Sequence, residues 1–195
     1  KKAGFTLLFN QPRSFIKVGS HPLLPNHLVK VYFDTDRREK KRLEKEVPSW
    51  RWLAYRVEGA KQVQRILTAY HIKHFVVPKK WIYPLPPKPF PTTKVKTRAR
   101  NCILIVENMN LASYEENLDA WKNRMTKEHL DELFTIIKFA GGGAYRADNV
   151  ALTKSGKFAL IDTEYPYKTG RYHSVESYLS DEMLRYWRKL VRTVE

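Results

Sequence analysis

Cysteine is nearly absent from this chain, and the scarcity excludes several kinds of site. Cys102 is the only cysteine among 195 residues, so the chain can form neither an intramolecular disulfide nor a zinc site built from several cysteines. Its position in the apolar run "NCILIV" predicts a buried strand residue. The six histidines have no H-E-x-x-H or comparable zinc spacing, and Ser155 and Ser174 lack a nucleophile-elbow context. The sequence therefore gives no support to zinc-peptidase or serine-hydrolase chemistry, and we expect most histidines to be surface or packing residues.

Long apolar runs are absent as well. The sequence contains no stretch of 18 apolar residues and no hydrophobic core of a signal peptide. It therefore predicts no transmembrane segment and no export by the general secretory route. We expect a cytoplasmic protein, with secretion by another route left open. The sequence starts at "KKAGF", and we expect native residues to precede it.

Acidic residues are scarce relative to basic ones. Thirty-six Lys and Arg residues face 20 Asp and Glu residues, which gives a formal charge of +16. Such an excess attracts anionic partners, including nucleic acid, anionic lipid and phosphorylated molecules. The basic residues are spread over several segments, without a C2H2 finger, an RNP-like strand or a basic zipper. We interpret the charge mainly as a solvated basic surface. The alternative is a basic binding module for nucleic acid, an acidic protein or an anionic lipid.

The first half of the chain has the pattern of a small sheet with one helix. The apolar runs "FTLLF", "SFIKV" and "HLVKVYF" are separated by turn residues, which predicts short antiparallel strands. Apolar residues at helical spacing from Val57 to Tyr70 predict an amphipathic helix. The stretch "FVVPKKWIYPLP" predicts a pair of strands interrupted by Pro78, and a basic, Pro-rich exposed loop follows at 86–100. The run "CILIVE" predicts a central strand buried on both faces.

The second half is mostly helical in pattern and contains one hairpin. Thr126 can cap a helix whose apolar stripe ends at three consecutive glycines, 141–143. The short strands "VAL" and "FALI" flank the turn "TKSGK", which predicts a hairpin. A helical pattern returns from Ser180 to Val194. The order of elements predicts an α+β protein with two lobes.

Two polar side chains stand at the ends of the predicted hairpin. Asp162 follows the strand "FALI", and Asn149 precedes the partner strand "VAL". Because the two strands of a hairpin are antiparallel, these two strand ends meet. Carboxylate and amide oxygens are the hard ligands that Mg²⁺ prefers. The sequence therefore predicts a magnesium site at Asn149 and Asp162.

The segment "GGGAYRADNVALTKSGKFALIDTEYP", residues 141–166, resembles the catalytic half of the protein-kinase-like superfamily. In that superfamily an Asp-x-x-x-x-Asn loop, a hairpin and a metal-binding Asp follow in this order. "IDTE" stands where protein kinases carry Asp-Phe-Gly, a variation that resembles the atypical and small-molecule kinases. The likeness is best over residues 103–164. It implies an N-lobe with hinge at 1–109, an abbreviated helical C-lobe at 110–195, and ATP and Mg²⁺ as ligands.

The resemblance also implies roles for residues upstream of the hairpin. Lys30 in "HLVKVYF" would bind the phosphates, oriented by a glutamate of the next helix, for which Glu58 is preferred to Glu46. Three residues of the hinge region would line the adenine site: Val106 at its back, and Glu107 and Met109 through backbone groups. Arg146 stands where kinases commonly carry a cation that faces phosphate.

The chain departs from the family pattern in two places. No G-x-G-x-x-G occurs in residues 1–33, and counting back five from Asn149 reaches Ala144 instead of the catalytic Asp. A methyl group can neither accept a proton nor orient a hydroxyl. Three explanations compete: a natural pseudokinase, an active kinase whose Asp was replaced experimentally, or, least favoured, Asp148 as a substitute. The polar residues retained around Arg146 favour a recent or engineered loss.

Taken together, the sequence predicts a kinase-like protein that binds ATP and Mg²⁺. It would be a phosphotransferase in its active form, impaired as given because Ala144 replaces the catalytic carboxylate. The phosphate acceptor would be a protein or a small molecule. The 31 residues after "IDTE", 165–195, are too few for the full helical lobe of a protein kinase, so we expect its usual peptide platform to be absent or rebuilt.

Overall fold

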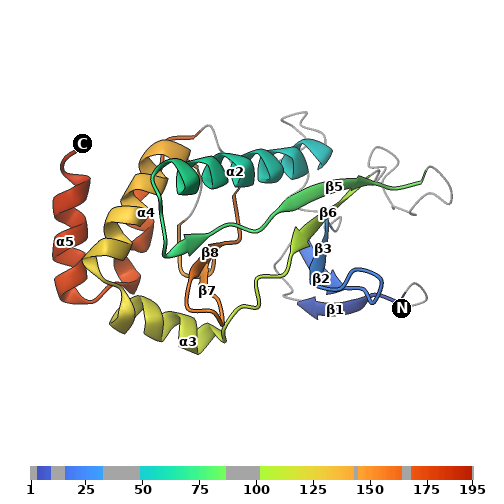
Figure 1. The fold of residues 1–195 in the computed structure, drawn as a ribbon, viewed down its shortest axis with the longest axis horizontal. Helices are drawn as coiled ribbons and strands as arrows, with labels where there is room; N and C mark the ends of the chain where they lie inside the picture. The colour runs from blue at the N-terminus through green and yellow to red at the C-terminus, as the bar shows by residue number, and fades with distance from the viewer. Residues whose placement is uncertain are drawn as a thin grey trace, which may run out of the picture. The chain divides into compact units, whose positions relative to one another are not determined.

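A computed structural model describes residues 4–9, 16–32, 49–86, 102–142, 145–163 and 168–194 (Figure 1). The protein is an α+β fold, as the sequence predicts. Its chain divides into two compact units, each made of two segments. The first unit comprises Lys1–Val57 and Lys79–Asn108, and the second comprises Glu58–Pro78 and Met109–Glu195. Helix α2 (Ser49–Ala69) contributes residues to both units.

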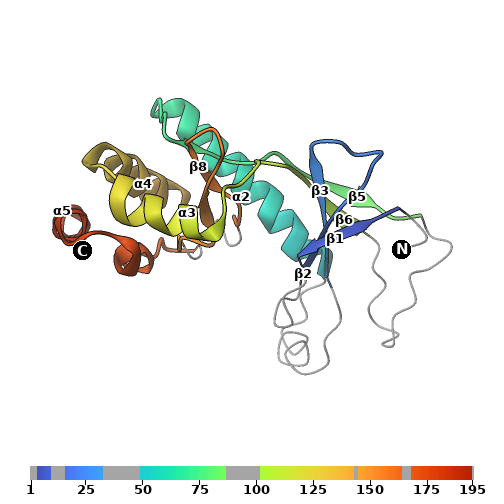
Figure 2. The ribbon, with the colours of Figure 1, turned by 90° about the horizontal axis from the view of Figure 1, so that it is seen from below.

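The first unit contains a five-stranded sheet in which every neighbouring pair of strands is antiparallel (Figure 2). Its strands, in spatial order, are β1 (Thr6–Phe9), β2 (Ile16–Ser20), β3 (His27–Tyr32), β6 (Cys102–Glu107) and β5 (Lys80–Pro84). The three apolar runs near the N-terminus form β1, β2 and β3, so the predicted antiparallel sheet is confirmed. The predicted Pro-rich loop lies outside the described residues except for its first residue.

Strand β6 is central, as predicted, but it is not buried on both faces. Leu104 and Val106 are buried and pack against Leu53 of α2, whereas Ile103 and Ile105 are only half-buried. In an antiparallel sheet one face can be covered by a helix while the other stays partly exposed, so apolar side chains alternate between the two environments. Cys102 packs at the edge of this cluster and is half-buried, and burial raises the pKa of its thiol.

The two strands predicted within "FVVPKKWIYPLP" both exist, but they do not pair with each other. β4 (Phe75–Val76) pairs in parallel with β8 (Phe158–Leu160) of a three-stranded sheet, whereas β5 pairs with β6. Between them lies Pro78, which has no N–H to donate and therefore cannot continue a strand ladder. The chain leaves one sheet before this residue and enters the other at Lys80.

Helices build most of the second unit. They are α3 (Tyr114–Asp119), a π-helical turn η1 (Ala120–Arg124), α4 (Lys127–Ala140), a 3-10 helix η2 (Tyr172–Tyr178) and α5 (Asp181–Val191), with the second part of α2. The helix α4 lies beside α5 (Figures 1 and 2). The buried core includes Trp121, Leu133, Phe158 and Trp187. Among the described helices, none combines the length and apolarity needed to cross a membrane.

Capping residues explain where these helices begin. Thr126 accepts a hydrogen bond from the backbone N–H of His129, and α4 ends at Gly141, which has a φ of 60°. Ser180 caps α5 in the same way through Met183. Both helices were predicted. The short helix α3 was not predicted, although Ser113 and Glu116 carry the signature of a capping box, which the structure contains.

Candidate functional site

The hairpin of the second unit brings Asn149 and Asp162 to the same end of two strands. β7 (Val150–Leu152) is antiparallel to β8, with Val150 opposite Leu160. The ladder continues one step further, because the N–H of Ile161 donates to the carbonyl of Asn149 at 2.9 Å. Asn149 immediately precedes β7, and Asp162 comes shortly after the end of β8. The two residues therefore occupy neighbouring positions at the same end of the hairpin. The predicted hairpin, and the neighbouring positions of these two residues, are both present.

The side chains of Asn149 and Asp162 lie between an apolar core and solvent. Both residues are half-buried, and Oδ1 of Asp162 is a buried atom. Every residue of β7, which follows Asn149, and of β8, which precedes Asp162, is buried. A carboxylate and an amide oxygen at such neighbouring positions form a donor set that suits a hard cation such as Mg²⁺. The residues present therefore fit the predicted ion.

A tight turn leads into Asn149. The carbonyl of Arg146 accepts hydrogen bonds from the N–H groups of both Asn149 and Val150, each at 2.9 Å. The Arg146 side chain donates to Oδ2 of Asp148 at 2.7 Å, and about half of each side chain is exposed. Asp148, the alternative catalytic carboxylate, is thus engaged with its neighbour. Ala144 lies outside the described residues.

A buried asparagine that the sequence analysis did not single out fixes the chain on both sides of Asn149. Asn117 of α3 donates to the carbonyl of Ala147 and accepts from the N–H of Leu152, each at 2.7 Å. The indole N–H of Trp121 donates to the carbonyl of Val150 at 2.9 Å. These bonds join α3 and η1 to the hairpin. No spacing rule points to Asn117; the capping box before it indicates only that a helix begins there.

Replacing Asn117 by alanine should therefore destabilise the second unit. The change leaves a buried carbonyl and a buried N–H without the partner that each now has, which costs about 2 kcal/mol of unfolding free energy or more. Urea denaturation followed by circular dichroism measures the loss. The matched control is Asn123→Ala, because Asn123 is exposed and its side-chain amide donates to Asp119 at the surface. Equal losses in the two variants would contradict the role of Asn117.

Helix α2 approaches the other side of the hairpin through a glycine. A Cβ atom added to Gly59 would lie 2.0 Å from the carbonyl oxygen of Thr163, the residue that follows Asp162. Real Cβ contacts are never this short, so α2 and this segment touch backbone to backbone. A lone glycine inside a helical pattern is a recognisable signal of such an approach. The apolar spacing of this segment predicted the helix but not this contact.

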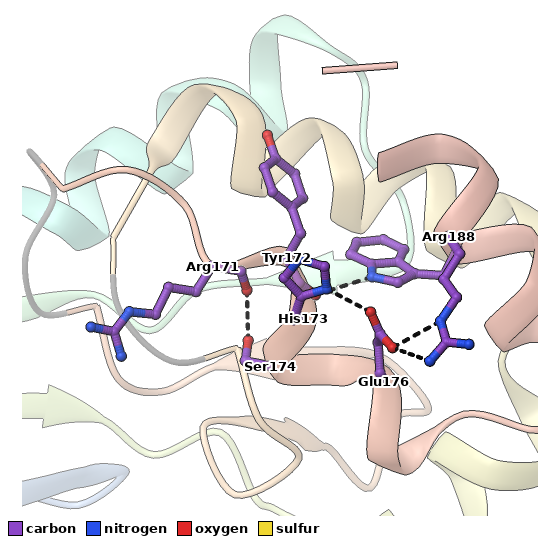
Figure 3. A network of polar contacts seen from close by, with 7 residues as sticks. Arg171, Tyr172, His173, Ser174, Glu176 and Arg188 are labelled. Carbon is purple, nitrogen blue, oxygen red and sulfur yellow. Dashed lines mark hydrogen bonds and ion pairs between the residues drawn. The ribbon is translucent and has the colours of Figure 1, made fainter. Parts of the chain in front are cut away.

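The chain on both sides of Ala144 is anchored as well. The hydroxyl of Tyr145 donates to the carbonyl of Gly141, and its N–H donates to Oγ of Ser174 at 3.2 Å. Oγ of Ser174 donates in turn to the carbonyl of Arg171 at 2.7 Å, which ties this segment to the start of η2 (Figure 3). Burial, and in addition the nearby Tyr172, raise the pKa of Tyr145 well above its ordinary value. The hydroxyl therefore remains a hydrogen-bond donor at any ordinary pH.

Glu176 joins η2 to α5 and so supports that anchor. Its carboxylate lies between His173 and Arg188 and contacts each at 2.7 Å (Figure 3). Burial raises the pKa of Glu176, but the hydrogen bonds from His173 and Arg188 outweigh it and hold that pKa below its usual value. The indole N–H of Trp187 in α5 donates to the carbonyl of Tyr172 at 3.0 Å. The 3-10 helix is thus fixed to α5 by one charged contact and one partly buried hydrogen bond.

The predicted phosphate and adenine residues of the first unit lie in its sheet. Lys30 is in β3, opposite Val18 and Leu104, and is half-buried. Val106 is buried in the neighbouring strand. Glu107 exchanges hydrogen bonds with Lys79: its N–H donates to the Lys79 carbonyl at 3.0 Å, and its Oε2 accepts from the Lys79 N–H at 3.1 Å. With its N–H used, the backbone group that Glu107 could offer to a base is its carbonyl.

The remaining predicted residues belong to the second unit. Glu58 is exposed on α2, next to Gly59, and Met109 is half-buried where the chain enters this unit for the second time. The alternative partner of Lys30, Glu46, lies outside the described residues. Of the predicted site, the structure therefore brings together Asn149 and Asp162 within the second unit, and Lys30 and Val106 on adjacent strands within the first.

Comparison with known proteins leaves the family open. No protein-family model matches the chain, and no curated protein matches it significantly. Among solved structures it is similar to a MAP kinase, LmaMPK10 from Leishmania major, with 15% sequence identity and a TM-score of 0.37. The match covers 84% of this chain and 47% of that kinase, so the chain spans about half the length of the structure it matches. A likeness this weak decides neither the family nor the function.

Proposed function

We propose that the protein is a kinase-like ATP-binding protein that holds Mg²⁺ with Asn149 and Asp162. The observation that supports the proposal is the register of the β7–β8 hairpin, in which Asn149 and Asp162 occupy neighbouring chain positions at the same end of a buried strand pair. The hard-ligand chemistry of the pair supports magnesium, and the anchors on Asn117, Gly59 and Tyr145 would keep the site in one geometry.

In this proposal each further residue has a defined task. Lys30 of the first unit would bind phosphate oxygens, and Arg146 of the second unit would face phosphate at the entrance to the turn. The kinase resemblance gives Glu58 the task of orienting the lysine. Val106 closes the back of the adenine site, and Glu107 and Met109 offer backbone groups. Bound Mg²⁺ would neutralise charge on the phosphates. The family would supply the general base from position 144, and Ala144 removes it, so the chain as given binds nucleotide without efficient transfer to a protein or small-molecule acceptor.

The test is calorimetric titration with ATP, with and without Mg²⁺, of the unmodified chain and of Asp162→Asn. We expect saturable 1:1 binding that depends on Mg²⁺ and weakens at least about tenfold in the variant, because the amide carries no charge to offset that of the ion. The matched control is Asp119→Asn, which removes an exposed carboxylate elsewhere in the second unit and should leave the affinity unchanged. Unaltered Mg-ATP affinity in Asp162→Asn would overturn the proposed site.

The competing function is a basic binding module, which the net charge of +16 favours. Such a module would bind a polyanion without Mg²⁺, and its affinity would fall steeply as salt displaces the protein's contacts. Running the titrations at two salt concentrations, with heparin as the polyanion probe, separates the two. Tight, salt-sensitive heparin binding together with no ATP binding would favour the module.

A further inference from the structure

We propose that His74, Glu128 and Glu132 form a binding site for a divalent transition-metal ion, separate from Asn149 and Asp162. One ligand atom from each of the three side chains lies within 4.8 Å of the other two. His74 immediately precedes β4, whereas Glu128 and Glu132 are one turn apart on α4. All three belong to the second unit. Because the ligands come from separate segments, no zinc spacing in the sequence could indicate the site.

The contact between His74 and Glu132 has the geometry of two ligands that share an ion. Nδ1 of His74 is a buried atom 3.2 Å from Oε2 of Glu132, and among the described residues it makes no hydrogen bond. Two atoms bonded at about 2.0–2.2 Å to one tetrahedral zinc ion are about 3.3–3.5 Å apart. The observed separation of 3.2 Å is close to this edge of a coordination tetrahedron, so a small adjustment would let both atoms bind one ion.

Glu132 is held in place by the chain that carries His74. Its Oε1 accepts the backbone N–H of Lys73 at 2.9 Å, and its Oε2 accepts that of His74 at 3.0 Å. The side chain of Glu132 is only 13% exposed, against 31% for that of His74. Hydrogen bonds of this kind orient a ligand before the metal arrives, which strengthens a site. The same oxygen, Oε2 of Glu132, also faces Nδ1 of His74, which capping of this turn does not require.

Glu128 supplies the third ligand from the solvent side. It is exposed in the first turn of α4, so its side chain can change rotamer to complete the coordination without disturbing the core. The neighbouring ring of His129 lies 4.2 Å from that of His74, but its Nδ1 is bonded to Oγ1 of Thr126 at 2.6 Å. The site is therefore one imidazole and two carboxylates, with a coordination position open to water.

This ligand set selects against magnesium. An imidazole nitrogen suits zinc, cobalt or nickel, whereas Mg²⁺ prefers oxygen alone. The site also lies at the opposite end of β8 from Asp162, since the N–H of Phe158 at the start of that strand donates to the carbonyl of His74. Zinc binding and Mg-ATP binding are thus separable in experiment.

The test is titration of the full chain with Zn²⁺ in competition with a chromophoric chelator. We expect one site whose affinity falls at least tenfold in Glu128→Gln and in His74→Ala, with no displacement by millimolar Mg²⁺. The matched control is His173→Ala, which breaks another histidine–glutamate pair, at 2.7 Å, whose carboxylate contacts Arg188 instead of a further metal ligand. Co²⁺ in place of zinc should give visible absorption bands that disappear in the same two variants.

Glu128→Gln keeps the test decisive if His74→Ala fails to fold, because Glu128 is an exposed surface residue. Zinc affinity that is unchanged in Glu128→Gln, or that drops equally in His173→Ala, would overturn the proposal. So would the lack of any binding to the unmodified chain at millimolar zinc.

Discussion

Gly59→Ala is expected to destabilise the second unit by about 1–3 kcal/mol, although alanine is the better helix former. In an unconstrained helix the substitution would stabilise by up to about 1 kcal/mol. Here the new methyl group would lie 2.0 Å from the carbonyl oxygen of Thr163, and also 3.1 Å from its Cβ, so backbone on one side must move. Overpacking of this kind in a rigid interior destabilises the protein by more than the higher helix propensity of alanine stabilises it. The sign of the change therefore distinguishes the two effects.

Thermal or urea unfolding measures the stability of Gly59→Ala, and Mg-ATP titration measures the consequence for the site. Because Thr163 follows Asp162, displacing it should also weaken Mg-ATP binding if the proposed site is correct. Lys61→Ala is the matched control, since it alters an exposed position two residues along the same helix. A Gly59→Ala protein as stable as the Lys61→Ala protein would show that α2 does not pack this closely.

Ala144→Asp is expected to raise phosphate transfer by about 10²–10⁴-fold over the chain as given. That range is the usual contribution of a positioned general base. The described residues nearest to position 144 are held in place, because the hydroxyl of Tyr145 donates to the carbonyl of Gly141. Transfer of labelled phosphate from ATP to the protein itself and to water measures the gain without knowledge of the natural acceptor.

Two further variants make that result specific. Ala144→Asn has nearly the same shape as Ala144→Asp but cannot accept the proton, so it should show no gain. Adding Asp162→Asn to Ala144→Asp should abolish the gain, since both residues would act on one nucleotide. If Ala144→Asp binds Mg-ATP as the unmodified chain does and still transfers nothing, the prediction is wrong and a natural pseudokinase becomes the better description.

Local pattern was sufficient for much of the fold. Apolar period, caps and turn residues, all of which act over a few neighbours, predicted α4, α5, the part of α2 from Val57, the β7–β8 hairpin and the strands of the first sheet. They did not predict that α2 begins at Ser49, before the apolar pattern starts. Pairing across long separations does not follow from such signals. Phe75 pairs with Phe158, far along the chain, and this partner gives β4 its place in the second sheet instead of beside β5.

The candidate site likewise has residues that local sequence signals predicted and contacts that they did not. Asn149 and Asp162 could be placed together from sequence because a hairpin fixes which strand ends meet. The bonds from Asn117 and the contact at Gly59 could not, because each depends on how a helix docks against the hairpin. The triad of His74, Glu128 and Glu132 could not be predicted from the sequence either, since Glu132 of α4 meets the backbone of Lys73 and His74 only in the folded chain.

The division of the second unit into two segments has a consequence for synthesis on the ribosome. By Asn108 every part of the first unit has been made, whereas residues 58–78 of the second must wait for β8 and α5. Meanwhile Val63, Ile66, Leu67 and Phe75 lack the core in which they are finally buried. Exposed apolar surface of this kind invites aggregation and chaperone binding during translation. We therefore expect the nascent chain to depend on chaperones most while residues 109–191 are being added.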